Sequence, residues 1–306
     1  MKIAAMILIL AVAAGLCAQQ APKLSVGVDV VPLLATVHDR DGKIVKNLTP
    51  ADFILKEDGI PQKITYFARE SDLPLTIGLL VDTSTSQKGV LEEERRASYK
   101  FLDQVLREGK DQAFVVSFDF QVRTLQGFTS SRSELASALD QVKIPDRTGT
   151  LIYSAVRESS EDLMQNQPGR KAFILLTDGV AFKEPTPIVT AIEFAQRADT
   201  IIYSIRFSDP LDSFDPIRAA VLGIFKERGK QGLQRMARET GGISFEVTKD
   251  QSIEAIYSQI EEALRNQYSI GYTPERQFAD GKYHKIKLTT TDPHLAVVAR
   301  AGYYAK

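Results

Sequence analysis

Five oxygen-bearing side chains stand in the sequence where a sheet protein could gather them around a hard cation. They are Asp82, Ser84, Ser86, Thr150 and Asp178. If the 82–86 loop is extended, its alternate residues can turn their oxygens to one side. Hydroxyl and carboxylate oxygens suit Mg²⁺, which prefers octahedral oxygen ligands and keeps several of its waters. The pattern therefore predicts a Mg²⁺ site, in which Mn²⁺ or Ca²⁺ could replace Mg²⁺.

The neutral hydroxyls of this set predict what a bound ion would do. Three hydroxyls carry no formal charge, so an ion that they ligate directly stays strongly electrophilic. If the two carboxylates act through water, an open coordination position favours an anionic oxygen from outside the protein. We therefore expect a protein or peptide partner that bears an acidic side chain, bound through the ion.

The elements that would position these side chains are those of an α/β fold. Strand-like runs, several of them continuously apolar, cover 75–81, 113–118, 172–176, 201–207 and 244–247. Helical patterns lie at 90–107, 133–142, 151–164, 188–198, 233–239 and 252–266. The alternation predicts a doubly wound, mostly parallel, Rossmann-like sheet, with 122–128 as an antiparallel edge strand. Ligands of such sheets bind at the carboxyl ends of the strands.

Two further stretches predict a small β unit beside that sheet. Residues 24–70 alternate short extended runs with Asp-Gly turns, which are hairpin signals, and 266–306 returns to β character. We expect both stretches to pack together beside the α/β domain, which we place at 73–265. The long, charged and glycine-bearing segment 209–232 is expected to be mobile.

The start of the chain predicts export. Lys2 precedes an apolar run that ends at Leu16, and Cys17 and Ala18 follow. This pattern indicates a signal peptide at 1–18 and a periplasmic or secreted product. Leu16 is larger than the residue that usually precedes a lipid-modified cysteine, so lipid attachment is disfavoured. No later segment reaches the ~18 apolar residues of a membrane span.

Composition narrows the classes of partner and chemistry. The single cysteine falls at the predicted cleavage site, so the mature chain would have no disulfide, thiolate metal site or cysteine nucleophile. The formal net charge of -1 gives no reason to expect nucleic acid or an anionic membrane as a partner.

The candidate site resembles the metal-ion-dependent adhesion site of the von Willebrand factor type A domain. Asp82-x-Ser84-x-Ser86, Thr150 and Asp178 match its three parts in order and in position relative to the strands. The resemblance covers the predicted α/β domain. It implies direct ligation by Ser84, Ser86 and Thr150, with Asp82 and Asp178 nearby or acting through water. It also implies a cation-dependent binding or adhesion function.

Two details qualify this resemblance. Thr148 competes with Thr150 for the threonine role, and Gly149 favours Thr150 because the family has a Gly-Thr pair there. The flanks resemble a group of exported bacterial proteins related to this domain, for which no activity is implied. The matching segments are 26–71, 281–287 and 301–304.

Simpler interpretations exist for single residues. Asp82 and the serines could cap the following helix, because Asp and Ser are favoured at that position. Asp119, which follows the second strand, could belong to the site, but we favour a solvated turn carboxylate. The charged run 92–96 is expected to be a solvated helix face. The three histidines of the flanks are expected to be exposed or structural, and their five tyrosines are expected to build the core of the β unit rather than to bind a ligand. They are His38, His284, His294, Tyr268, Tyr272, Tyr283, Tyr303 and Tyr304.

An enzyme is the less favoured alternative. Phosphotransfer on an Asp nucleophile usually needs a second Asp two residues later, where this chain has Ser84. A Walker A motif and a nucleophile elbow are absent, and no histidine falls in the α/β domain. We therefore expect a protein that is not an enzyme. A structural scaffold whose metal site is vestigial is the other alternative.

Overall fold

The computed structural model describes residues 30–69, 73–147, 149–207, 216–274 and 281–305. The predicted signal peptide and Thr148 lie outside these ranges. Within the described ranges, no helix is both long enough and apolar enough to cross a membrane.

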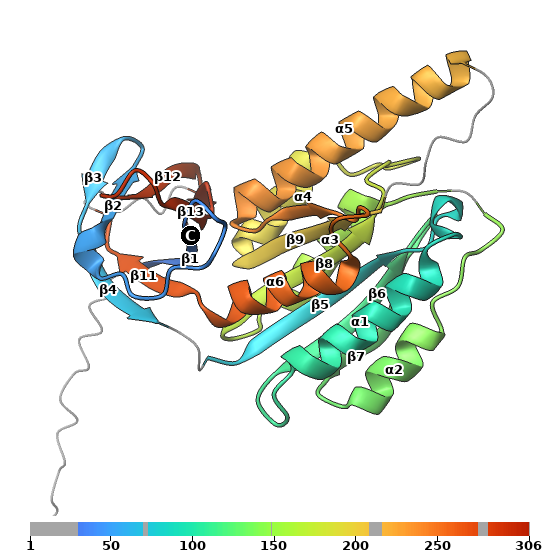
Figure 1. Ribbon diagram of the computed structural model, residues 1–306, viewed down its shortest axis with the longest axis horizontal. Helices are drawn as coiled ribbons and strands as arrows, with labels where there is room; N and C mark the ends of the chain where they lie inside the picture. Colours follow the sequence, from blue (N-terminus) through green and yellow to red (C-terminus); the bar gives the residue numbers. More distant parts are fainter. Residues whose placement is uncertain (1–29, 70–72, 148, 208–215, 275–280, 306) are drawn as a thin grey trace, which may run out of the picture.

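A six-stranded sheet forms the centre of the larger part of the chain (Figure 1). The strand order is β10-β9-β8-β5-β6-β7, in which neighbouring strands are parallel except for β7, which pairs antiparallel with β6. The strands are β5 (Leu75–Asp82), β6 (Gln112–Phe118), β7 (Val122–Thr129), β8 (Arg170–Thr177), β9 (Thr200–Arg206) and β10 (Ser244–Glu246). Every residue of β5, β8 and β9 is buried. The predicted parallel sheet with an antiparallel edge is thereby confirmed.

Helices cover both faces of this sheet. One face packs against α1 (Leu91–Val105), α2 (Arg132–Asp140) and α6 (Ile253–Arg265). The other face packs against α3 (Ile152–Glu158), α4 (Ile188–Arg197) and α5 (Pro216–Thr240). Along β5, alternate side chains enter the two cores, because successive residues of a strand point to opposite faces. Two cores, one on each face, make the fold doubly wound.

A small β unit is built from both ends of the chain. Its two sheets have the orders β13-β1-β11-β4 and β14-β12-β2-β3. Strands from the two ends of the chain alternate in the first sheet, and in the second a C-terminal pair of strands adjoins an N-terminal pair. The strands are β1 (Val31–His38), β2 (Phe53–Glu57), β3 (Ile60–Gln62), β4 (Ile64–Arg69), β11 (Tyr268–Tyr272), β12 (Tyr283–Thr290), β13 (Ala296–Ala299) and β14 (Gly302–Tyr304). The unit lies at the end of the large sheet where β5 begins, at the left of Figure 1. The carboxyl ends of the parallel strands are at the opposite end.

The segment expected to be mobile is largely helical, which corrects the sequence-based expectation. Helix α5 runs from residue 216 to residue 240, whereas a helix was predicted only from 233. The glycines of this stretch suggested a loop, but Gly229 has a packing role. A Cβ atom at Gly229 would lie 2.5 Å from the carbonyl oxygen of Gly179. A glycine is therefore needed at position 229, because the backbone of α5 approaches the backbone of the loop after β8 closely there. The helix forms around this glycine.

Candidate functional site

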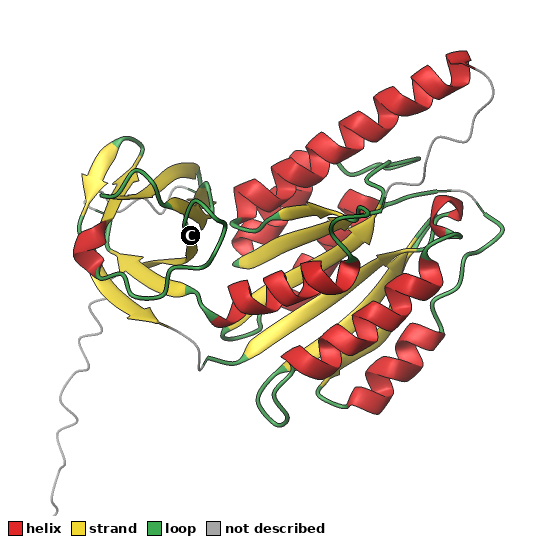
Figure 2. Cartoon of the chain, viewed as in Figure 1, coloured by secondary structure: helices red, strands yellow, loops and turns green. Residues whose placement is uncertain are grey.

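Figure 2 shows the loops that leave the carboxyl edge of the large sheet. The predicted site residues fall at the strand ends and in the connecting segments of this edge. Asp82 is the last residue of β5, and Asp178 follows β8, the strand paired with β5. Thr150 precedes α3. Parallel pairing of β5 and β8 brings their ends together, so the two aspartates stand at neighbouring strand ends.

Asp82 lies beneath the serine loop and holds it by hydrogen bonds. Its side chain is 0% exposed. Its Oδ1 accepts a hydrogen bond from the backbone N–H of Ser84 at 2.8 Å, and its Oδ2 accepts one from the Thr177 hydroxyl at 2.5 Å. The hydroxyl oxygens of Ser84 and Ser86 lie 3.0 Å apart. The loop therefore places two hydroxyls side by side above a buried carboxylate.

Helix capping does not account for these residues. The N-cap of α1 is Val90, which forms no side-chain capping hydrogen bond. The N-cap of α3 is Leu151, also without one, so Thr150 does not cap that helix. Instead, Glu184 accepts hydrogen bonds from the N–H of Tyr153 at 2.7 Å and from the hydroxyl of Ser154 at 2.6 Å, which links the loop after Asp178 to the start of α3.

Asp119 is not the solvated turn residue that the sequence suggested. Its side chain is 0% exposed, accepts a hydrogen bond from the Thr83 hydroxyl at 2.7 Å and pairs with Arg123. Its carbonyl oxygen accepts a hydrogen bond from the N–H of Leu151 at 3.0 Å. Asp119 thus connects the Asp82 loop to the Thr150 loop. The sequence could not indicate this, because the residues that cover the turn are distant along the chain.

The Thr150 loop is joined to the Asp178 loop by backbone pairing. The N–H of Thr150 donates to the carbonyl of Phe182 at 2.9 Å, and the N–H of Phe182 donates back at 3.2 Å. Gly149 is required for the approach of the Thr150 loop to the turn between β6 and β7, since a Cβ atom there would lie 2.6 Å from the Cα of Phe120. Together with the Thr177–Asp82 and Thr83–Asp119 hydrogen bonds, this pairing closes a ring of four connected loops.

The electrostatics of this edge are unbalanced. Burial, together with the nearby negative charge of Asp178, raises the pKa of Asp82 to about 7. Asp178 is also buried, and its Oδ1 accepts a hydrogen bond from the N–H of Val180 at 2.8 Å. Among the described residues, neither aspartate forms an ion pair with Lys or Arg. A divalent cation would supply the missing positive charge, and the oxygen donors present suit a hard ion.

Glu94, in the run expected to be a solvated helix face, is a fourth buried acid. It is 0% exposed, and neither of its carboxylate oxygens has a hydrogen-bond partner among the described residues. The expectation for this residue was wrong. Its spacing held the signal, because Glu94 shares the helix face of Leu91, Ala97 and Phe101, which are buried.

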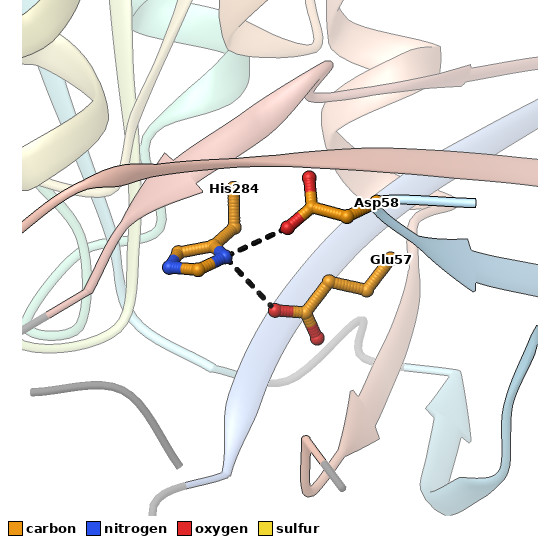
Figure 3. A group of neighbouring side chains, drawn as sticks. All are labelled: Glu57, Asp58 and His284. Carbon is orange, nitrogen blue, oxygen red and sulfur yellow. Dashed lines mark hydrogen bonds and ion pairs between the residues drawn. The ribbon is translucent and has the colours of Figure 1, made fainter. Parts of the chain in front are cut away.

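A separate acidic group lies in the β unit, far from this edge. Figure 3 shows His284 of β12 with its Nδ1 atom facing the carboxylates of Glu57 and Asp58. The distances from Nδ1 are 2.9 Å to Asp58 Oδ2 and 3.6 Å to Glu57 Oε1. The three ligand atoms lie within 4.8 Å of one another, so the group could hold a metal ion. As it stands, the ring links the β2–β3 hairpin to β12, in agreement with the structural role expected for His284.

Comparison with known proteins identifies the larger unit. A family model for the von Willebrand factor type A domain matches residues 77–180. A search of the curated proteins found no match. The fold resembles a solved structure of proximal thread matrix protein 1 from the mussel byssus, which is described as having a zinc-occupied MIDAS motif. The two chains share 15% sequence identity, with a TM-score of 0.52. The match covers 68% of this chain and 49% of the mussel chain, so it spans about half the length of that protein.

Two bacterial structures are also similar. BatB, a conserved hypothetical protein from Bacteroides thetaiotaomicron, has 17% identity and a TM-score of 0.48, and the match covers 64% of this chain and 100% of that one. The vWF domain of the type V pili tip protein Mfa5 from Porphyromonas gingivalis has 14% identity and a TM-score of 0.46, with coverage of 63% and 95%. At these identities, the likeness concerns the fold alone.

Proposed function

The chain contains a von Willebrand factor type A domain, and from this premise we propose that it is an exported binding protein that grips a partner's carboxylate through a divalent cation. The expected ion is Mg²⁺. The observation that carries the proposal is the pair of buried aspartates, Asp82 and Asp178, whose carboxylates form no ion pair with a Lys or Arg of the described residues and adjoin the Ser84–Ser86 hydroxyl pair. A bound cation would neutralise the aspartates and take the hydroxyls as ligands.

In this proposal, one set of residues ligates the ion directly, and a second set acts on it from nearby or through water. Ser84, Ser86 and Thr150 would ligate the ion directly. Asp82 and Asp178 would stay nearby or act through water, which leaves only neutral oxygens in direct contact. When bound, the ion would supply a Lewis-acidic vertex that is free for a carboxylate oxygen. The zinc-occupied MIDAS motif described for the mussel protein supports a divalent ion at this edge of the fold.

The surroundings of the edge suit a protein or peptide partner. Phe182, whose backbone pairs with Thr150, is 51% exposed. Helix α5, which contacts the Asp178 loop at Gly229, carries an arc of exposed apolar side chains. They are Val221, Leu222, Ile224 and Phe225. Exposed apolar side chains grouped near a polar centre are typical of a surface that binds another protein.

The proposal places the protein outside the cytoplasm, in the periplasm or the medium, without lipid attachment. This part is supported by the charged, apolar and small residues of 1–18 alone. Cell adhesion is the role that best combines export with cation-dependent binding.

Isothermal titration calorimetry with Mg²⁺ or Mn²⁺ tests the proposal. We expect heat on titration of the wild type and none with Asp82→Ala, because the substitution removes a buried charge that the ion would neutralise. A pull-down from envelope or medium should then recover a partner that EDTA releases and that Asp82→Ala fails to bind. Absence of heat from the wild type with both ions would support a scaffold with a vestigial site. Partner binding that EDTA does not affect would contradict the proposed mode of binding.

A further inference from the structure

Glu94 is buried in α1 without any group that neutralises it. Its side chain is fully shielded from solvent, and both carboxylate oxygens lack hydrogen-bond partners among the described residues. An ionised carboxylate in that position is strongly disfavoured unless a cation lies close to it. A protein gains nothing in stability from such a group, since an uncharged side chain of similar size would pack there at lower cost.

The topology places Glu94 close to the candidate cation centre. Strands β5 and β6 are parallel, so α1 must run back across the sheet between them, and its first turns lie over the carboxyl end of β5. The groups that act on Glu94 agree with this placement. Burial, then the negative charges of Asp82 and Asp178, and last that of exposed Glu93, raise the pKa of Glu94 well above its usual value. The fourth titratable group facing it is Tyr257 of α6.

Glu94 is not grouped closely enough with the two aspartates to share one ion as a direct ligand. In the part of the chain that the structure describes, Asp82, Asp178 and Glu94 do not bring three carboxylate oxygens within 4.8 Å of one another. One ion could not take all three as direct ligands. Glu94 would therefore act on an ion through a bridging water or through its long-range charge. Acidic groups outside the direct ligands influence metal sites in this way.

We propose that Glu94 is a sixth side chain of the cation centre, a buried carboxylate that a divalent ion neutralises and that sets how tightly the ion is held. This inference rests on the proposed function, because it needs a cation at the Asp82 loop. It differs from a packing role in one respect. A packing residue stabilises the cation-free protein, whereas Glu94 destabilises the cation-free protein and strengthens the binding of the ion.

The test compares Glu94→Gln with wild type in two measurements at about pH 8, where Asp82 is mostly ionised. By calorimetry, we expect Glu94→Gln to weaken Mg²⁺ binding by about 10- to 100-fold, as found for groups next to metal ligands. In EDTA, we expect its thermal midpoint to rise by at least about 2 °C, because glutamine is buried without a change of protonation, whereas Glu94 must either take up a proton or hold an unpaired charge. Glu94→Leu should shift both quantities in the same directions, which keeps the test open if one variant folds poorly.

The matched control is Glu93→Gln, which removes the same charge from the exposed neighbouring position and should change neither quantity. Unchanged Mg²⁺ affinity in both Glu94 variants, while Asp82→Ala abolishes binding, would overturn the role of Glu94 and leave the proposed function standing. A lower thermal midpoint in EDTA for both Glu94 variants would also overturn it, in favour of packing. Failure of the wild type to bind any divalent ion would remove the proposed function and this inference together.

Discussion

Four acidic side chains lie buried near the carboxyl end of β5, and three of them, Asp119, Asp82 and Glu94, have different environments. Asp119 pairs with Arg123 and accepts a hydrogen bond, so its charge is compensated. Asp82 accepts two hydrogen bonds but has no cation beside it. Glu94 has neither. A buried charge is tolerated when it is paired. Asp119 therefore has a structural role in holding the loops together, whereas Asp82 and Glu94 indicate a ligand that carries positive charge.

Ser84 and Ser86 give the most direct test of ligation. Their hydroxyls contact each other at the sheet rim, and the loop is held from below by Asp82. We expect Ser84→Ala and Ser86→Ala each to weaken Mg²⁺ binding at least about tenfold, while the free energy of unfolding in EDTA changes by only about 0.5 kcal/mol. Calorimetry and thermal unfolding measure the two effects.

Ser131 supplies the matched control for the serine variants. Its side chain caps α2 by accepting a hydrogen bond from the N–H of Glu134, away from the candidate site. Ser131→Ala should cost about 1 kcal/mol of stability and leave Mg²⁺ affinity unchanged. A large loss of stability in EDTA for Ser84→Ala would assign that serine to the fold rather than to the ion.

At the scale of elements, the candidate site depends on contacts between loops and on one helix. The four loops form a closed ring of hydrogen bonds, and α5 contacts the Asp178 loop where Gly229 meets Gly179. Gly179 itself has a φ of +85°, a left-handed conformation that favours glycine. The Asp178 carboxylate is therefore positioned by backbone contacts that leave no room for a side chain.

Gly229→Ala should disturb the site without touching any proposed ligand. A Cβ atom there would lie 2.5 Å from the Gly179 carbonyl oxygen, so the Asp178 loop must move. We expect weaker Mg²⁺ binding and a lower thermal midpoint, although alanine is otherwise favoured in a helix by about 1 kcal/mol. Calorimetry and thermal unfolding measure both.

Gly223, in the same helix, is the control. A Cβ atom there would meet nothing within 4 Å, so Gly223→Ala should raise the thermal midpoint and leave Mg²⁺ affinity unchanged. Equal behaviour of the two variants would show that the contact between Gly229 and Gly179 does not position the site.

At the scale of the whole molecule, the β unit and the candidate site occupy opposite ends of the large sheet (Figure 1). The β unit needs both ends of the chain, because β1 lies between β11 and β13. It meets the large sheet where β5 begins, so the carboxyl edge is left open to a partner.

The stability of the cation-free protein should fall as the pH rises towards neutral. Folding raises the pKa of Asp82 from 3.8 to about 7. The protonated side chain therefore contributes its full stabilisation below about pH 3.8, and this stabilisation is lost as the pH rises through about 7. Each pKa unit corresponds to about 1.4 kcal/mol, so the loss is a few kcal/mol. Glu94 acts in the same direction. Thermal midpoints in EDTA from about pH 5 to about pH 8 measure the fall.

Mg²⁺ and Asp82→Asn are the controls for this pH dependence. Saturating Mg²⁺ should cancel most of the fall, because the ion binds the ionised form, and Asp82→Asn should lack the Asp82 part in EDTA. At the acidic end, stability should decrease for another reason. Burial alone would raise the pKa of Asp111, but hydrogen bonds from Arg107 hold it below its usual value, so protonation of Asp111 at low pH loses stability. A midpoint in EDTA that rises steadily to pH 8 would contradict the first part.

The sequence by itself determined the elements and the identity of the candidate donors. Continuous apolar runs predicted the buried parallel strands, and the Asp-Gly pair at 58–59 predicted a hairpin turn whose residues have positive φ. These signals are local, since periodicity and turn chemistry act between residues a few positions apart. The order of Asp82, Ser84, Ser86, Thr150 and Asp178 after the correct elements was visible for the same reason.

Only the tertiary structure decided which acids are buried and which glycines are contacts. Asp119 looked solvated, and Gly229 looked like part of a loop, because the groups that cover them come from distant segments. For Glu94 the helix spacing indicated a buried face, but only the structure showed that no group compensates its charge among the described residues. Burial depends on which elements pack together. The low dielectric constant of the buried site is what makes a charge near Asp82 act strongly on that residue. The sequence identified the side chains that could ligate an ion. The packing around them showed that their negative charge is uncompensated, and this charge would favour binding of a cation.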